Sequence, residues 1–165
     1  MHRLAWFFFV LCLAASATFI VATTHALPEQ VASHFGSGNA ANGFMTRGGY
    51  LAFMLAFAVV LPLFLATMIG LLPRMRPNAI NLPHRDYWLD PKRREATMGA
   101  LSALGAWLGS LITIFIAAMH YVLIVANETS PPQLPADLFR MLLIGFVVGI
   151  ALWIGTLLLR FRNVR

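Results

Sequence analysis

Four apolar runs, each long enough to cross a lipid bilayer, constrain the fold of this chain more than any other feature. A membrane helix needs ~20 mostly apolar residues, because ~30 Å of hydrocarbon must be crossed at a rise of ~1.5 Å per residue. Hydrophobic residues make up 59% of the 165 residues and charged residues 11%, which excludes a soluble domain of this length. The sequence therefore predicts an all-α membrane protein, a single integral domain over residues 1–165 with transmembrane helices at about 4–24, 50–72, 98–124 and 138–159.

The distribution of Lys and Arg predicts the direction of each helix, because these residues are retained on the cytoplasmic side during insertion. Ten of the twelve fall near the chain ends or between the second and third runs, whereas Arg47 and Arg140 fall on the other side. Both termini are therefore expected in the cytoplasm, with an outer loop at 25–49 and an inner loop at 73–97. Alternating helices joined by loops predict an antiparallel four-helix bundle. The first run could instead be a cleaved signal peptide, because Ala15-Ser16-Ala17 resembles a cleavage site.

The net charge of +6 suggests a negatively charged partner. Basic residues cluster between the apolar runs without forming the basic face of a nucleic-acid-binding domain, so we expect contact with the lipid bilayer and not with nucleic acid. Cys12, the single cysteine, can form neither an intramolecular disulfide nor a site with a second thiolate. Asp90 followed by Pro91 predicts that the third helix begins ahead of its span. The inner-loop candidates for contact with lipid or a protein partner are Arg85, Tyr87, Trp88, Lys92, Arg93 and Arg94.

Glycines spaced four residues apart predict where the helices pack, because small residues allow helix backbones to approach closely in lipid. The third run offers Gly105 and Gly109, and the fourth offers Gly145 and Gly149. Packing within one chain is the favoured interpretation. One glycine face could alternatively bind a second copy of the chain, giving a homo-oligomer, or a larger membrane partner.

The outer loop is the one long polar, glycine-rich segment between apolar runs. Pro28 prevents the first helix from simply continuing, and Asn42-Gly43 is a turn signal. His34 is the loop residue best suited to chemistry, and with His25 and Glu29 it could bind zinc or copper. The favoured interpretation makes His34 and Phe35 a small plug that folds back onto the helix ends.

The loop also resembles a known family. Its order of Leu27-Pro28, Val31, His34-Phe35-Gly36 and small residues through Gly43 resembles the outer loop of a bacterial membrane family, domain of unknown function 1648, related to the N-terminal part of SdpI-type immunity proteins. The inner loop is similar to this family at Asn81-Leu82-Pro83, at 86–89 and at 91–95. The resemblance implies a multi-pass protein of the bacterial cytoplasmic membrane. Its outer loop would bind a peptide or protein in immunity or sensing, with these candidate binding residues: Pro28, His34, Phe35, Gly36, Asn42 and Gly43.

We predict no enzymatic activity and no cofactor, because the sequence holds no nucleophile with an orienting base, no phosphate-binding loop and no carboxylate deep in a span. Pro62 predicts a kink in the second helix, which in a transporter could frame a substrate site. His120, near the outer end of the third run, is predicted to bond to water or a neighbouring helix. An accessory subunit of a larger membrane complex remains the main alternative function.

Overall fold

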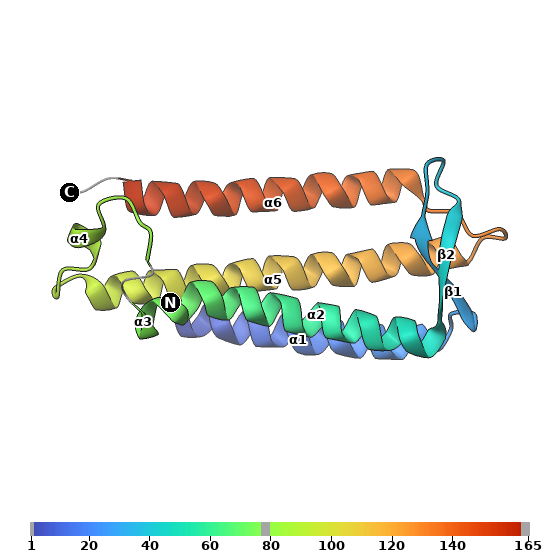
Figure 1. Cartoon of the computed structure of the whole chain (residues 1–165), viewed down its shortest axis with the longest axis horizontal. Coiled ribbons are helices and arrows are strands. Elements are labelled where there is room, and N and C mark those ends of the chain that lie inside the picture. The colour runs from blue at the N-terminus through green and yellow to red at the C-terminus, as the bar shows by residue number, and fades with distance from the viewer. Residues whose placement is uncertain (1, 77–79, 163–165) are drawn as a thin grey trace.

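The computed structural model describes residues 2–76 and 80–162, in which four long helices run along a common axis (Figure 1). Successive long helices run in opposite directions. A β-hairpin lies at one end of the molecule, and two short helices lie at the other, near the start of the first long helix and the end of the last. The elements in chain order are α1 (His2–Thr24), β1 (Gln30–Phe35), β2 (Ala41–Thr46), α2 (Arg47–Gly70), α3 (Leu72–Met75), α4 (Arg85–Trp88), α5 (Arg94–Asn127) and α6 (Ala136–Arg162).

Each of the four apolar runs forms one long helix, and these helices are long and apolar enough to cross a membrane. The prediction of a mostly helical chain with four candidate spans is therefore confirmed. The third of these helices begins at Arg94, ahead of its apolar run. Asp90 lies in the turn before it, where its carboxylate accepts a hydrogen bond from the Lys92 amide at 3.0 Å. α2 continues as one helix through Pro62, whose side chain is buried.

The hairpin corrects the all-α prediction. β1 and β2 pair antiparallel in register from Gln30 opposite Thr46 to Phe35 opposite Ala41, with irregularities around His34. The prediction of a turn at Asn42-Gly43 was wrong, because both residues lie in β2. The chain reverses instead through Gly38 and Asn39, which adopt positive φ angles of 91° and 64°. Glycine and asparagine are the residues that tolerate this region best, so the turn forms where they follow one another.

α5 is the helix on which the others pack. It contacts α1, α2 and α6, whereas α6 packs chiefly against α5. A Cβ atom at Gly105 would lie 2.5 Å from the carbonyl oxygen of Ala66 in α2, and one at Gly109 would lie 2.7 Å from the ring of Phe9 in α1. The glycine pair of α5 therefore permits close contact with both neighbours.

The glycine pair of α6 behaves differently. A Cβ atom at Gly149 would meet the side chain of Leu111 in α5 at 2.8 Å, whereas one at Gly145 would have no atom within 4 Å. The prediction that both glycines pack internally is therefore wrong for Gly145. The physical reason is that α6 packs chiefly against α5, so the side of α6 that carries Gly145 has no neighbour among the described residues.

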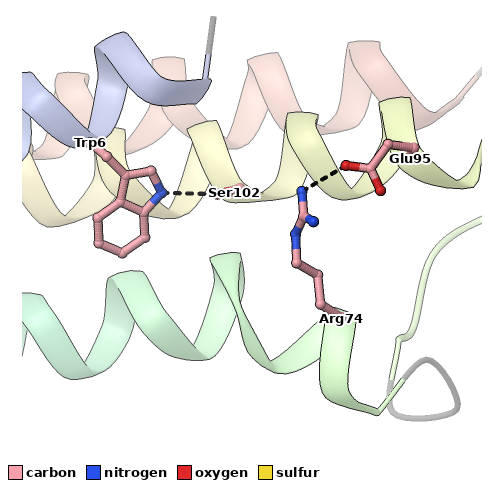
Figure 2. A network of polar contacts seen from close by, with 4 residues as sticks. All are labelled: Trp6, Arg74, Glu95 and Ser102. Carbon is pink, nitrogen blue, oxygen red and sulfur yellow. Dashed lines mark hydrogen bonds and ion pairs between the residues drawn. The ribbon is translucent and has the colours of Figure 1, made fainter.

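Polar side chains tie the helices together at the end opposite the hairpin. The Trp6 indole of α1 donates to the Ser102 hydroxyl of α5 at 2.9 Å. Nearby, the guanidinium of Arg74 in α3 reaches the Glu95 carboxylate of α5 at 3.1 Å (Figure 2). The Trp153 indole of α6 donates to a backbone carbonyl of α5, that of Leu104, at 2.9 Å. These contacts fix α1, α3 and α6 around the start of α5.

Candidate functional site

The β-hairpin is the candidate recognition element, and its inner face packs on the ends of the helices. Val31 is fully buried and belongs to one apolar cluster with Leu27, with Tyr50 of α2 and with Leu123 of α5. Phe35 and Met45 are half-buried against the same cluster. Burial of apolar surface on a helical platform gives this two-stranded sheet the support that an isolated hairpin lacks.

The side chain of Asn127, at the end of α5, holds the outer edge of β1. The Ala32 amide donates to its Oδ1 at 2.8 Å, and its Nδ2 donates to the Ala32 carbonyl at 3.0 Å. Nδ2 also donates to the Leu123 carbonyl at 2.8 Å, which orients the amide plane. One side chain thus pairs with both backbone groups of a buried strand residue, much as a neighbouring strand would.

The two ends of the hairpin are also tied down. At its base, the Arg47 guanidinium donates to the carbonyls of His25 and Leu27 at 3.2 and 3.0 Å, and the Thr46 hydroxyl accepts from the Gly49 amide to cap α2. At its tip, the amide of Leu134 donates to the carbonyl of Asn39 at 2.9 Å. The α5–α6 connection therefore packs against the turn of the hairpin.

A buried polar network joins three helices beneath the hairpin. The imidazole of His120 lies 2.7 Å from the Thr23 hydroxyl through Nε2 and 2.8 Å from the Tyr50 hydroxyl through Nδ1. Thr23 donates its one proton to the Phe19 carbonyl, so it accepts from Nε2–H, and the Tyr50 hydroxyl donates to Nδ1. With a neutral imidazole, this assignment gives every N–H and O–H hydrogen of the network an acceptor. His120, which was predicted to bond to water or to a neighbouring helix, bonds to two helices.

The structure brings four of the predicted binding residues together and separates the other two. A Cβ atom at Gly43 would lie 3.0 Å from the Cβ of His34, and one at Gly36 would lie 3.0 Å from the Asn42 amide. The glycines therefore leave room for these two polar side chains to cross the hairpin. Phe35 instead packs toward the helix ends, and Pro28 is exposed in the connection from α1. The plug interpretation holds for Phe35 but not for His34, which is exposed.

The exposed side of β2 carries residues that the sequence interpretation missed. These are Phe44 and Thr46, which alternate as exposed positions with Asn42, a residue that the sequence did predict, and 54% of the Phe44 surface is exposed. A large apolar side chain on the polar end of the molecule is a candidate contact for another protein. No alternation of polar and apolar residues marks this strand, because Phe44 and Met45 are both apolar although Phe44 is exposed, so the sequence carried no signal for its exposed face.

The metal alternative has no ligand set. Across residues 2–76 and 80–162, no group of three His, Cys, Asp or Glu side chains is arranged to hold a metal ion. His34 instead has its Nδ1 2.9 Å from the neighbouring Ser33 hydroxyl. A zinc or copper site built from His25, Glu29 and His34 is therefore not formed in this structure.

The inner-loop residues divide into two groups. Lys92 and Arg94 are exposed and can contact lipid headgroups or a partner. Trp88, by contrast, donates its indole N–H to the Phe161 carbonyl of α6 at 3.2 Å and packs edge-on against the Phe161 ring. Arg93 lies over the Tyr87 ring, 4.0 Å from its centroid. The aromatic residues of this loop therefore join α4 to α6 at the end of the molecule opposite the hairpin.

Comparison of the chain with protein-family models, curated proteins and solved structures gives no match. The resemblance of the two loops to the immunity-protein family therefore stays a prediction. What the structure establishes is a mostly helical chain with four candidate membrane spans and a docked hairpin at one end.

Proposed function

We propose that this chain is a non-enzymatic, multi-pass membrane protein that binds an extended peptide or protein segment through its outer hairpin. The observation that supports this proposal is a difference between the two edges of the hairpin. The edge of β1 is occupied by Asn127. The start of β2 is bonded to the α5–α6 connection, where the Ala41 amide donates to the Pro132 carbonyl at 3.2 Å, but from Asn42 onward no third strand lies beside β2 within the described residues. An open strand edge next to an exposed aromatic ring suits peptide recognition by strand addition.

The hydrogen-bond register identifies the residue at the centre of this edge. Antiparallel pairs alternate between bonded and non-bonded positions. The bond from the Arg47 amide to the Glu29 carbonyl and the contacts of Ala32 with Asn127 make Ala32 and Phe44 a non-bonded pair. The N–H and C=O of Phe44 consequently point away from β1. Phe44 thus offers a donor, an acceptor and an aromatic ring to the same ligand.

The proposed topology is an antiparallel four-helix bundle in the bacterial cytoplasmic membrane, with both termini in the cytoplasm and the hairpin outside. Support comes from the charge distribution. α3, α4 and the end of α6 carry Arg74, Arg85 and Arg160 and lie at the end of the molecule opposite the hairpin (Figure 1). Retention of basic residues on the cytoplasmic side then directs the hairpin outward.

The proposed biological role is immunity or sensing of a secreted peptide, in line with the resemblance of the loops to SdpI-type immunity proteins. A hairpin held by Asn127 of α5, and by an apolar cluster in which Val31 packs with residues of α1, α2 and α5, can pass a binding event to these helices.

The test is site-specific photocrosslinking in living cells, with the crosslinker at Phe44 and a matched control at Phe53. The two rings are similarly exposed, at 54% and 52%, but Phe53 lies in the apolar run of α2. A secreted peptide captured at position 44 and not at 53 supports the proposal.

Two substitutions then distinguish the contribution of the Phe44 ring to binding from that of the Phe44 backbone. Phe44→Ala removes the ring alone, whereas Phe44→Pro also removes the outward N–H while leaving the ladder bonds to β1 in place. We expect binding of the captured peptide to fall for Phe44→Ala and to fall further, by about fivefold to tenfold, for Phe44→Pro. Equal binding by the two variants would contradict strand addition.

A specific observation also favours the alternative of an accessory subunit. α6 packs chiefly against α5, and neither Gly145 nor Gly155 would have an atom within 4 Å of an added Cβ. Small residues on an open helix face permit close approach of another membrane helix. Purification in a mild detergent distinguishes the two functions, because an obligate subunit would co-purify with its complex in stoichiometric amounts.

A further inference from the structure

A groove opens between α1, α5 and α6 at the end of the molecule opposite the hairpin. Its first part is a cavity of about 600 Å³, with a floor of small residues in α5 that includes Gly99 and Ala103. A second cavity of about 250 Å³ shares Leu104, Trp107 and Thr156 with the first and extends it along α6 to Gly149. The two cavities therefore form one continuous groove between α5 and α6.

The groove is more than long enough to cover the hydrocarbon depth of one leaflet of a membrane. Its α5 lining extends over residues 95–111, which at ~1.5 Å per residue covers about 24 Å. One leaflet contributes about half of the ~30 Å of hydrocarbon thickness. A lipid chain that enters at the inner end would therefore remain in the groove over the full depth of its leaflet.

The polarity of the groove changes along its length. Its charged and titratable lining residues, His2, Glu95 and Arg160, lie at the inner end, and the deeper lining is apolar apart from Thr156. Trp107 lines both parts, with 47% of its surface exposed, and its ring contacts that of Phe8 at 5.3 Å between centroids. One polar end and a long apolar body fit an amphiphile better than a membrane helix, which is apolar over most of its length.

The charges at the mouth favour an anion. Glu95 is engaged by Arg74, whose guanidinium approaches it from α3 (Figure 2). Arg160 is exposed and makes no ion pair with any residue of the described segments. Its guanidinium can therefore donate to a phosphate group, and charge-assisted bonds of this kind are among the strongest in proteins.

We propose that this groove binds an anionic phospholipid of the inner leaflet, with its phosphate at Arg160 and one acyl chain against Gly99, Ala103 and Trp107. Basic residues between helices at the cytoplasmic side are a recurrent form of lipid recognition. The lipid would fill the space that α6 leaves beside α1, and it would support α6 on the side where this helix lacks protein contacts. The site lies at the opposite end of the molecule from the hairpin, so it is independent of peptide binding.

The test measures lipid retention by native mass spectrometry of the full chain, purified in detergent and supplied with equal amounts of phosphatidylglycerol and phosphatidylcholine. We expect the chain to retain phosphatidylglycerol preferentially. Arg160→Gln should lower that retention about tenfold, whereas Arg140→Gln, the same change at the other end of α6, should leave it unchanged. Equal retention of both lipids, or equal effects of the two substitutions, would overturn the proposal.

A second pair of variants tests the acyl-chain contact. An added Cβ at Gly99 would meet only the His2 imidazole, at 3.6 Å, so the backbone accepts a side chain there, and the leucine of Gly99→Leu would occupy the groove that Gly99 lines. Gly155→Leu adds the same side chain to a part of α6 that does not line the groove. Loss of phosphatidylglycerol from Gly99→Leu alone supports the site. If Gly99→Leu retains phosphatidylglycerol as well as the wild type does, the groove does not hold an acyl chain. The same conclusion would follow if the wild-type chain formed a dimer without bound lipid.

Discussion

Replacement of Asn127 by alanine tests how the hairpin is held. The substitution removes two hydrogen bonds to the backbone of Ala32, which is fully buried, and a third to the Leu123 carbonyl. The two bonds to Ala32 are the ones that hold the hairpin, and a net contribution of about 1 kcal/mol for each of them predicts a loss of roughly 2 kcal/mol. The loss should fall on docking of the hairpin and not on the helices, because the three bonds all lie at the end of α5.

Hydrogen exchange followed by mass spectrometry measures this local effect. At ~1.4 kcal/mol per factor of ten, amides of β1 and β2 should exchange about 30-fold faster in Asn127→Ala, while those in the middle of α5 should not change. Glu128→Ala is the matched control, because Glu128 is the exposed neighbour of Asn127. Asn127→Asp retains an acceptor for the Ala32 amide but loses both donors, so it should also accelerate exchange. Unchanged exchange in Asn127→Ala would refute the reasoning and leave apolar packing as the force that docks the hairpin.

Three further substitutions test the helix contacts by thermal unfolding in detergent. Tyr50→Phe removes the donor to the buried His120 imidazole and should lower the free energy of unfolding by about 1–3 kcal/mol. Tyr121→Phe, the control at an exposed position, should lower it by less than about 0.5 kcal/mol. Equal losses would contradict the proposed network. Gly105→Ala should lower the midpoint by several degrees because its Cβ would meet a carbonyl of α2, while Gly145→Ala should leave it unchanged or raise it slightly. Trp88→Phe removes the bond to the end of α6 and should cost about 1 kcal/mol; no change would show that ring packing alone holds this loop.

The sequence predicted the long helices because the signal for a membrane span is local. An apolar run of sufficient length must satisfy its own backbone hydrogen bonds in lipid, whatever surrounds it. The start of α2 also depends on a local signal, since Thr46 is a favourable cap before a helix. These features depend on residues that are neighbours along the chain.

The hairpin could not be predicted in the same way, because its stability depends on distant residues. Ala32 bonds to Asn127, ninety-five positions away, and Phe35 packs on a cluster formed by three different helices. Likewise, Trp88 has the sequence context of an interfacial anchor, yet its partner is Phe161 at the end of α6. Turn composition also misled, because Asn42-Gly43 and Gly38-Asn39 are both suitable for a reversal and only the latter forms one.

The pairing of Asn127 with Ala32 has a consequence for the length of the chain before it. Val31 is buried in the apolar cluster and Ala32 is bonded to Asn127, so the number of residues between the end of α1 and β1 must bring both residues to these places at once. An insertion of one residue there would place Val31 on the exposed side or break both bonds to Asn127. Related chains should therefore tolerate changes of residue type between positions 25 and 30 much more readily than changes in the number of residues.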